Sequence, residues 1–343
     1  MIKKAMFFEA LADQQVQCRL CAHACRIKNG QRGVCGVREN REGILYSLNY
    51  GMVVAENIDP IEKKPFFHLF PGSLSYSLAT VGCNFRCLFC QNHEISQLPR
   101  ETGDIVGRAV SAVEIVERAV RSGAKTIAYT YTEPTIFFEF AYDIARLARE
   151  RGIGNVFVTN GYMSREAVDA IAPYLDAANV DLKSFRDGFY REQCGARLQP
   201  VLDTISRMKE LGIWVEVTTL LIPGLNDSDE EIGATADYLC SIGAETPWHI
   251  SRFHPRYQML AGKITSVKEI RKAAGIGKSR GLRYVYSGNV PGEAGENTFC
   301  SRCGNLLISR YGFHIERLNL RESACPHCAT PLEGLFQFSS SSL

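Results

Sequence analysis

The chain has 343 residues, of which 45% are hydrophobic and 22% charged, and its formal net charge is +2. A chain of this length buries roughly 75% of its extended surface, so one large core with an appendage is expected. The balanced charge, without a basic stripe, gives no support for a nucleic-acid partner. The first residues lack the apolar segment of a secretory signal, and no run of about 18 apolar residues occurs, so we expect a cytoplasmic protein without a membrane span.

Thirteen cysteines are present, and most of them fall into three sets with the spacing of metal ligands. Disulfides are rare in a reducing compartment, so metal binding is the simpler explanation. The first set lies in an expected N-terminal segment, residues 1–73, and consists of Cys18, Cys21, Cys25 and Cys35. Either zinc or an auxiliary Fe–S cluster suits its spacing. His23, inside the set, is either a substitute ligand or a surface residue.

Residues 74–290 alternate between short apolar segments typical of strands and longer amphipathic segments typical of helices. We expect strands at 73–82, 125–134, 155–161, 177–185, 214–224, 248–255 and 281–289. We expect helices at 110–123, 135–152, 164–175, 199–212, 228–243 and 266–281. This alternation favours parallel βαβ units, which form a partial or full α/β barrel. The aromatic segment PIEKKPFFHLFPG, just before the first strand, is expected to close the barrel bottom, with substrate or partner docking as the alternative.

Polar side chains stand where several of the expected strands end, and these are Glu133, Asn160, Asp181 and His254. The carboxyl ends of parallel strands meet at one rim, where α/β folds place their sites. Each residue taken singly has a structural alternative, because polar residues at strand ends often cap the next helix.

The last expected segment, residues 291–343, carries two C-x2-C pairs that flank a strand-like stretch. Each pair presents two thiolates from one tight turn, as in a zinc ribbon or a rubredoxin-like site. The ligands would be Cys300, Cys303, Cys325 and Cys328. Zinc is the preferred metal and iron is the alternative.

A third pattern, TVGCNFRCLFCQNHE, places Cys83, Cys87 and Cys90 at C-x3-C-x2-C directly after the first strand. A structural zinc site needs four protein ligands, whereas three thiolates leave one iron of a [4Fe–4S] cluster open. The spacing, its position and the aromatic Phe89 together resemble the radical S-adenosylmethionine (radical SAM) superfamily. A zinc site completed by His93 is the alternative.

The resemblance implies a partial (β/α)6 TIM-like barrel and an enzyme of the kind that activates pyruvate formate-lyase. Such an enzyme cleaves S-adenosylmethionine reductively at a [4Fe–4S] cluster, and the resulting 5′-deoxyadenosyl radical abstracts hydrogen from a substrate. By the order of the family motifs, the resemblance assigns S-adenosylmethionine contacts to Phe89, Thr132, Glu133, Thr159, Asn160, Asp181, Lys183 and His254. The paired glycines that the family has before the glutamate are missing from TYTEP.

The chain also departs from the activases, because no cysteine lies between Gln91 and Tyr131. With cysteine sets at both ends, it resembles the radical SAM component of the AmmeMemoRadiSam system. That resemblance implies AMMECR1-like and Memo-like partners and a low-potential flavodoxin or ferredoxin as electron donor. The substrate is a protein, a peptide or a small molecule. The alternatives are a radical modification unrelated to glycyl radicals and a zinc-stabilised scaffold without activity.

Two cysteines stand outside the three sets. Cys240 falls on the apolar face of an expected helix and is interpreted as a core residue. Cys194 follows the fourth strand and is expected to face the rim, where a catalytic role is the lesser alternative.

Overall fold

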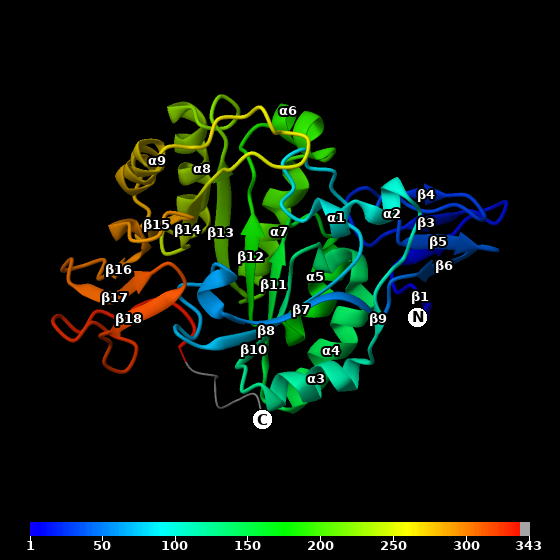
Figure 1. The fold of residues 1–343 in the computed structure, drawn as a ribbon, viewed down its shortest axis with the longest axis horizontal. Helices are drawn as coiled ribbons and strands as arrows, with labels where there is room; N and C mark the ends of the chain where they lie inside the picture. Colours follow the sequence, from blue (N-terminus) through cyan, green and yellow to red (C-terminus); the bar gives the residue numbers. More distant parts are fainter. Residues whose placement is uncertain (337–343) are drawn as a thin grey trace.

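The computed structural model describes residues 1–336, and its centre is a nine-stranded sheet in the order β15-β14-β13-β12-β11-β10-β8-β7-β9 (Figure 1). The parallel strands are β8 (Leu74–Thr80), β10 (Thr126–Tyr129), β11 (Gly154–Thr159), β12 (Ala177–Asp181), β13 (Trp214–Leu221), β14 (Trp248–Arg252) and β15 (Val285–Gly288). Because the sheet ends at β15 and β9 (Arg108–Ala109), it forms an open, partial barrel.

Six helices connect the parallel strands, which confirms the predicted (β/α)6 pattern. They are α3 (Ala112–Arg121), α4 (Phe138–Glu150), α5 (Arg165–Ile171), α7 (Gln199–Glu210), α8 (Asp229–Ile242) and α9 (Val267–Ser279). Capping boxes fix two of the starts, with Ser111 and Glu114 at α3 and Ser266 and Glu269 at α9. In each box the side chains satisfy backbone N–H groups that the first helical turn leaves free.

Shorter elements lie in the connections, and most of them fall outside the predicted helices. The α-helical ones are α1 (His93–Ser96), α2 (Leu98–Glu101) and α6 (Asp187–Phe189). The 3-10 turns are η1 (Ile61–Lys63), η2 (Pro134–Phe137), η3 (Ala172–Tyr174) and η5 (Ala294–Glu296), and η4 (Tyr190–Cys194) is a π-helical turn.

An additional strand, β7 (Met52–Pro60), pairs antiparallel with β8 and brings the end of the expected N-terminal segment into the barrel sheet. Residues 61–72 then fill the end of the barrel where the parallel strands begin. Phe66 and Leu69 pack there against side chains of β10, β11 and β12. Glu216 of β13 accepts hydrogen bonds from the backbone N–H groups of Phe67 and His68. This segment therefore closes the barrel bottom, as predicted.

Two small antiparallel sheets, at the blue end of the chain in Figure 1, precede the barrel. One contains β1 (Lys3–Lys4), β6 (Ile44–Ser47) and β5 (Arg38–Arg41), and the other β2 (Phe8–Ala10), β3 (Val16–Cys18) and β4 (Arg26–Ile27). Val16, Leu20 and Val37 belong to the same buried apolar cluster as Ile136 and Phe138 of the barrel layer. The N-terminal segment therefore shares the core of the barrel.

A C-terminal sheet of β16 (Thr298–Phe299), β17 (Leu306–Tyr311) and β18 (His314–Leu318) lies on the opposite side of the barrel (Figure 1). It packs on Phe67, Tyr284 and Tyr286 in a second apolar cluster. Arg310 Nη2 donates a hydrogen bond to the carbonyl of Phe67 at 2.9 Å. The last seven residues of the expected segment 291–343 lie outside the described residues. Within residues 1–336, no helix combines the length and apolarity needed to cross a bilayer.

Candidate active site

One cavity of about 340 Å³ opens at the carboxyl ends of β8, β10, β11 and β12. The family resemblance assigned one group of residues to the [4Fe–4S] cluster and to S-adenosylmethionine. All but one of these residues line this cavity. These are Cys83, Cys87, Phe89, Cys90, Thr132, Glu133, Thr159, Asn160, Asp181 and Lys183. Residues distant in the sequence thus meet at the rim where the parallel strands end, as the α/β pattern predicts.

The exception is His254, which is exposed and does not line the cavity. Strand β14 ends at Arg252, and the buried Phe253 takes the inward position after it. Side chains of an extended segment alternate between its two sides, so the next residue points outward. Ser251 and Asn289, on β14 and just after β15, contribute to the cavity wall instead.

The loop that carries the three thiols leaves β8 through Gly82, whose φ of +104° is open to glycine but rarely to other residues. Cys87 is buried, and Cys83 and Cys90 are half-buried. Burial raises the pKa of the Cys83 thiol well above its ordinary value. The Cys90 thiol lies 3.2 Å from the Ser96 hydroxyl.

Cys194 lies next to this loop, in the turn η4, and it is buried instead of facing the rim. Its carbonyl accepts a hydrogen bond from Arg86 N at 2.9 Å, and its thiol hydrogen-bonds Cys87. That hydrogen bond lowers the pKa of Cys87, because it stabilises the thiolate. No local pattern in the sequence connects these two cysteines.

Glu133 is buried and holds the strand-end loops of β10 and β11 together. Its Oε1 accepts hydrogen bonds from Thr135 N at 3.1 Å, from Thr135 Oγ1 at 2.5 Å and from Thr159 Oγ1 at 2.7 Å. Its Oε2 accepts from Asn160 N at 2.8 Å. Burial raises the pKa of Glu133 despite these donors.

Asp181 and Lys183 form an ion pair on the cavity wall, with Lys183 Nζ 2.9 Å from Asp181 Oδ2. Burial lowers the pKa of Lys183, but the negative charges of Asp181 and of the Cys87 and Cys194 thiolates outweigh it, so the net shift of the pKa is upward. The ammonium group also lies 5.8 Å from the centroid of the Phe89 ring. The pair therefore presents both a carboxylate and an ammonium group to a ligand.

The far wall of the cavity comes from the segment PIEKKPFFHLFPG, for which substrate or partner docking was the alternative interpretation, and from Tyr131 after β10. Lys64 Nζ and the Tyr131 hydroxyl both lie 2.7 Å from Asp59 Oδ2. Lys63, Lys64 and Tyr131 line the cavity, and Tyr131 adopts a φ of +63°. Two lysines of this segment thus border the cavity, which agrees with the alternative interpretation as well as with its place at the barrel bottom.

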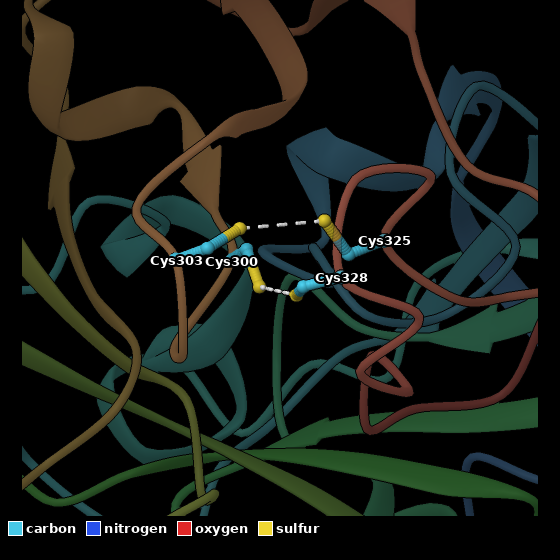
Figure 2. A group of neighbouring side chains, drawn as sticks. All are labelled: Cys300, Cys303, Cys325 and Cys328. Carbon is cyan, nitrogen blue, oxygen red and sulfur yellow. Dashed lines mark hydrogen bonds between the residues drawn. The ribbon is translucent and has the colours of Figure 1, made fainter.

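The C-terminal cysteines form a compact set (Figure 2). The sulfurs of Cys300 and Cys328 are 3.5 Å apart, and those of Cys303 and Cys325 are 3.6 Å apart. Tetrahedral zinc with Zn–S bonds of about 2.3 Å requires sulfurs about 3.8 Å apart. Hydrogen bonds from Thr330 lower the pKa of Cys328 to about 6, which favours the thiolate. These four residues are arranged to bind one metal ion.

The N-terminal cysteines Cys18, Cys21, Cys25 and Cys35 surround a second, narrow cavity together with His23. His23 Nε2 lies 2.8 Å from the carbonyl oxygen of Asn84. Outside the three sets, Cys240 is half-buried on α8, with its thiol 3.4 Å from the carbonyl of Arg280. His93 stacks on Tyr257 and does not line the main cavity, so the geometry does not support it as a fourth zinc ligand.

Comparisons with known proteins agree with this geometry. Residues 77–239 match the family model described as the radical SAM superfamily. The chain is 46% identical, over 97% of its length and 99% of the relative's, to the uncharacterized protein MJ0808 of Methanocaldococcus jannaschii. It is 26% identical over 45% of its length to a putative glycyl-radical enzyme activating enzyme of the same organism, and covers 58% of that relative.

Two further likenesses concern an activating enzyme and a solved structure. The pyruvate formate-lyase-activating enzyme of Clostridium pasteurianum is 25% identical over 47% of the chain and 67% of that enzyme. Streptococcus suis SuiB bound to S-adenosylmethionine superposes with a TM-score of 0.50 at 15% identity, over 67% of this chain and 55% of that one, which shows the fold. The chain therefore belongs to the radical SAM superfamily, whose members are enzymes that use S-adenosylmethionine and a [4Fe–4S] cluster.

Proposed function

We propose that the 340 Å³ cavity binds S-adenosylmethionine beside a [4Fe–4S] cluster held by Cys83, Cys87 and Cys90. The observation that carries this proposal is the convergence of three thiols, a buried carboxylate and an ion pair on one cavity. When bound, the cluster would supply one electron that cleaves a C–S bond of S-adenosylmethionine and starts hydrogen abstraction from a substrate.

The residues of the chain bind and orient the ligand. Lys183 would bind the carboxylate of S-adenosylmethionine, and Asp181 would accept hydrogen bonds from its ribose hydroxyls or ammonium group. Glu133 uses both oxygens to fix Thr159 and Asn160, so its main role is to position these two neighbours. Asn160 Nδ2 lies 3.8 Å from Cys83 Sγ, which connects the ligand wall to the cluster loop.

The cavity wall beyond these residues is where the hydrogen donor would sit. Lys63 and Lys64 give this wall positive charge, although Asp59 pairs with both. An activase-like reaction on a peptide or protein is the leading candidate, supported by the likeness to activating enzymes within the core. Radical modification of a small molecule, or of a partner in an AMMECR1 and Memo system, is the second candidate.

The enzyme needs a low-potential reductant, for which flavodoxin or ferredoxin is proposed. At the C-terminus, the close spacing of the four sulfurs supports a single metal ion, for which we propose zinc, with rubredoxin-like iron as the alternative. We further propose functional units at residues 1–73, 74–290 and 291–343, each with one cysteine set.

Anaerobic incubation with dithionite and S-adenosylmethionine, followed by analysis for 5′-deoxyadenosine, tests the proposal. The wild type should form it, Cys83→Ala should not, and Cys240→Ala should retain the activity because this cysteine lies outside the cavity. Adding AMMECR1-like or Memo-like proteins should raise the yield if one of them supplies the hydrogen. A wild type that binds only zinc and yields no 5′-deoxyadenosine would favour the scaffold alternative.

A further inference from the structure

Two residues that line the narrow cavity surrounded by the N-terminal cysteines each carry a buried donor without a partner in the described part of the chain. The donors are Arg38 Nε and Asn84 Nδ2, which have no hydrogen-bond partner among residues 1–336. Both residues are 1% exposed. A buried donor left without an acceptor destabilises the fold, so a bound group that accepts hydrogen bonds is expected between the cysteines.

The spacing of the sulfurs distinguishes the kind of group. Within residues 1–336, the C-terminal set is the one group of metal-ligand side chains whose atoms all lie within 4.8 Å of one another. No three N-terminal cysteines meet this spacing, and neither do Cys83, Cys87 and Cys90. In a [4Fe–4S] cluster each thiolate binds a different iron, so the sulfurs stand farther apart than around one zinc ion.

The N-terminal cysteine cavity lies directly against the loop that carries Cys83, Cys87 and Cys90. Asn84, which follows Cys83, lines the cavity, and its carbonyl contacts His23. A Cβ added at Gly82 would lie 3.2 Å from the carbonyl oxygen of Cys35. One short stretch of backbone therefore touches both cysteine sets.

We propose that Cys18, Cys21, Cys25 and Cys35 hold a second [4Fe–4S] cluster, which exchanges an electron with the cluster at Cys83. Arg38 Nε and Asn84 Nδ2 donate hydrogen bonds to its sulfur atoms. In the exchange, the reduced N-terminal cluster loses one electron, and the oxidised cluster held by Cys83, Cys87 and Cys90 gains it. A flavodoxin- or ferredoxin-class donor then reduces the N-terminal cluster again. The exchange rests on the proposed function, whereas the second cluster does not.

Iron and acid-labile sulfide analysis after anaerobic reconstitution tests the second cluster. The wild type should contain about eight sulfides per chain, and the variant Cys83→Ala/Cys87→Ala/Cys90→Ala about four. A second variant, Cys21→Ser/Cys25→Ser, should also lose about four and serves if the triple variant does not fold. A wild type that contains about four sulfides per chain would contradict the proposal of a second cluster. A triple variant that contains no sulfide and one additional zinc ion would also contradict it.

Electron paramagnetic resonance of the dithionite-reduced protein tests the exchange. Two adjacent paramagnetic clusters should give a broadened wild-type spectrum that differs from the sum of the spectra of the two variants. A spectrum equal to that sum would overturn the exchange. If the wild type yields no 5′-deoxyadenosine while the triple variant keeps its sulfide, the proposed function fails and the second cluster stands.

Discussion

Glu133 is a buried side chain that lines the cavity and also connects two strand-end loops. Its carboxylate lines the cavity but already accepts four hydrogen bonds from Thr135, Thr159 and Asn160. The sequence suggested a direct ligand contact, whereas the structure adds a positioning role. That role depends on contacts between two strands and could not be deduced from the local TYTEP motif.

Glu133→Gln replaces one of the two acceptor oxygens by an NH2 group. In either orientation of the amide, this NH2 group then faces a backbone N–H donor, that of Thr135 or that of Asn160. We expect the free energy of unfolding to fall by about 1–3 kcal/mol, because a buried donor loses its acceptor. Chemical denaturation measures this change, and Glu230→Gln, on the exposed surface of α8, is the matched control. Equal stability of the two variants would contradict the positioning role.

His68 lies in the segment that closes the barrel bottom, where it is fully buried. Its Nδ1 lies 2.6 Å from the carbonyl of Glu333, and its Nε2 lies 2.6 Å from the Tyr286 hydroxyl. The carbonyl can only accept, so Nδ1 donates and Nε2 accepts from Tyr286. The neutral ring is therefore the form that fits this site.

Burial lowers the pKa of His68 to about 4, although Glu216 and the Glu333 carbonyl act in the opposite direction. The unfolded chain, with an ordinary pKa of 6.5, therefore binds more protons than the folded chain between pH 6.5 and about 4. The free energy of unfolding should lose up to about 3 kcal/mol as the pH falls through this window. In His68→Gln this part of the pH dependence should disappear, while the exposed His314→Gln should retain it. Identical pH profiles for all three proteins would refute the assignment.

At the scale of elements, the regular alternation of strands and helices was predictable, because each segment has its own hydrophobic period. Strand β7 was not, since its buried and exposed residues do not alternate regularly. The position of His254 was also missed, because its motif fixes the order along the chain but not which neighbour turns inward. The buried Phe253 occupies that inward position.

The N-terminal segment contacts the loop that carries Cys83, Cys87 and Cys90, and this contact depends on the absence of a side chain at Gly82. A Cβ there would lie 2.7 Å from Val37 Cγ1. Gly103 also has a positive φ, +81°, but nothing lies within 4 Å of its added Cβ. Gly82→Ala should therefore lower the free energy of unfolding by about 1–3 kcal/mol more than Gly103→Ala. Thermal or chemical denaturation measures both losses of stability. A loss for Gly82→Ala no larger than that for Gly103→Ala would show that the chain is not closely packed at Gly82.

At the scale of the whole molecule, the two ends of the chain secure opposite sides of the barrel. The cysteine spacings predicted metal sites at both ends. They did not predict that the C-terminal segment would hold the loop that closes the barrel, through Arg310 on Phe67 and Glu333 on His68. These contacts join residues far apart in sequence, so no local pattern carries them.

Removal of the metal ion proposed for the C-terminal site should weaken these contacts between the C-terminal segment and the loop that closes the barrel. Cys303→Ser should lose about one metal ion per chain, because the proposed four-cysteine site loses a ligand. Limited proteolysis should then cut within residues 291–336 sooner than in the wild type or in Cys240→Ser. Unchanged metal content together with an unchanged digestion pattern would contradict a metal-dependent C-terminal segment.

The most direct test of the central claim is the electron paramagnetic resonance spectrum of the reduced protein before and after S-adenosylmethionine is added. Three thiolates leave one iron open, so the ligand should bind that iron and shift the signal of the Cys83 cluster. Cys83→Ala should lose this response, and Cys240→Ala should keep it. A wild-type spectrum that S-adenosylmethionine leaves unchanged would contradict the account.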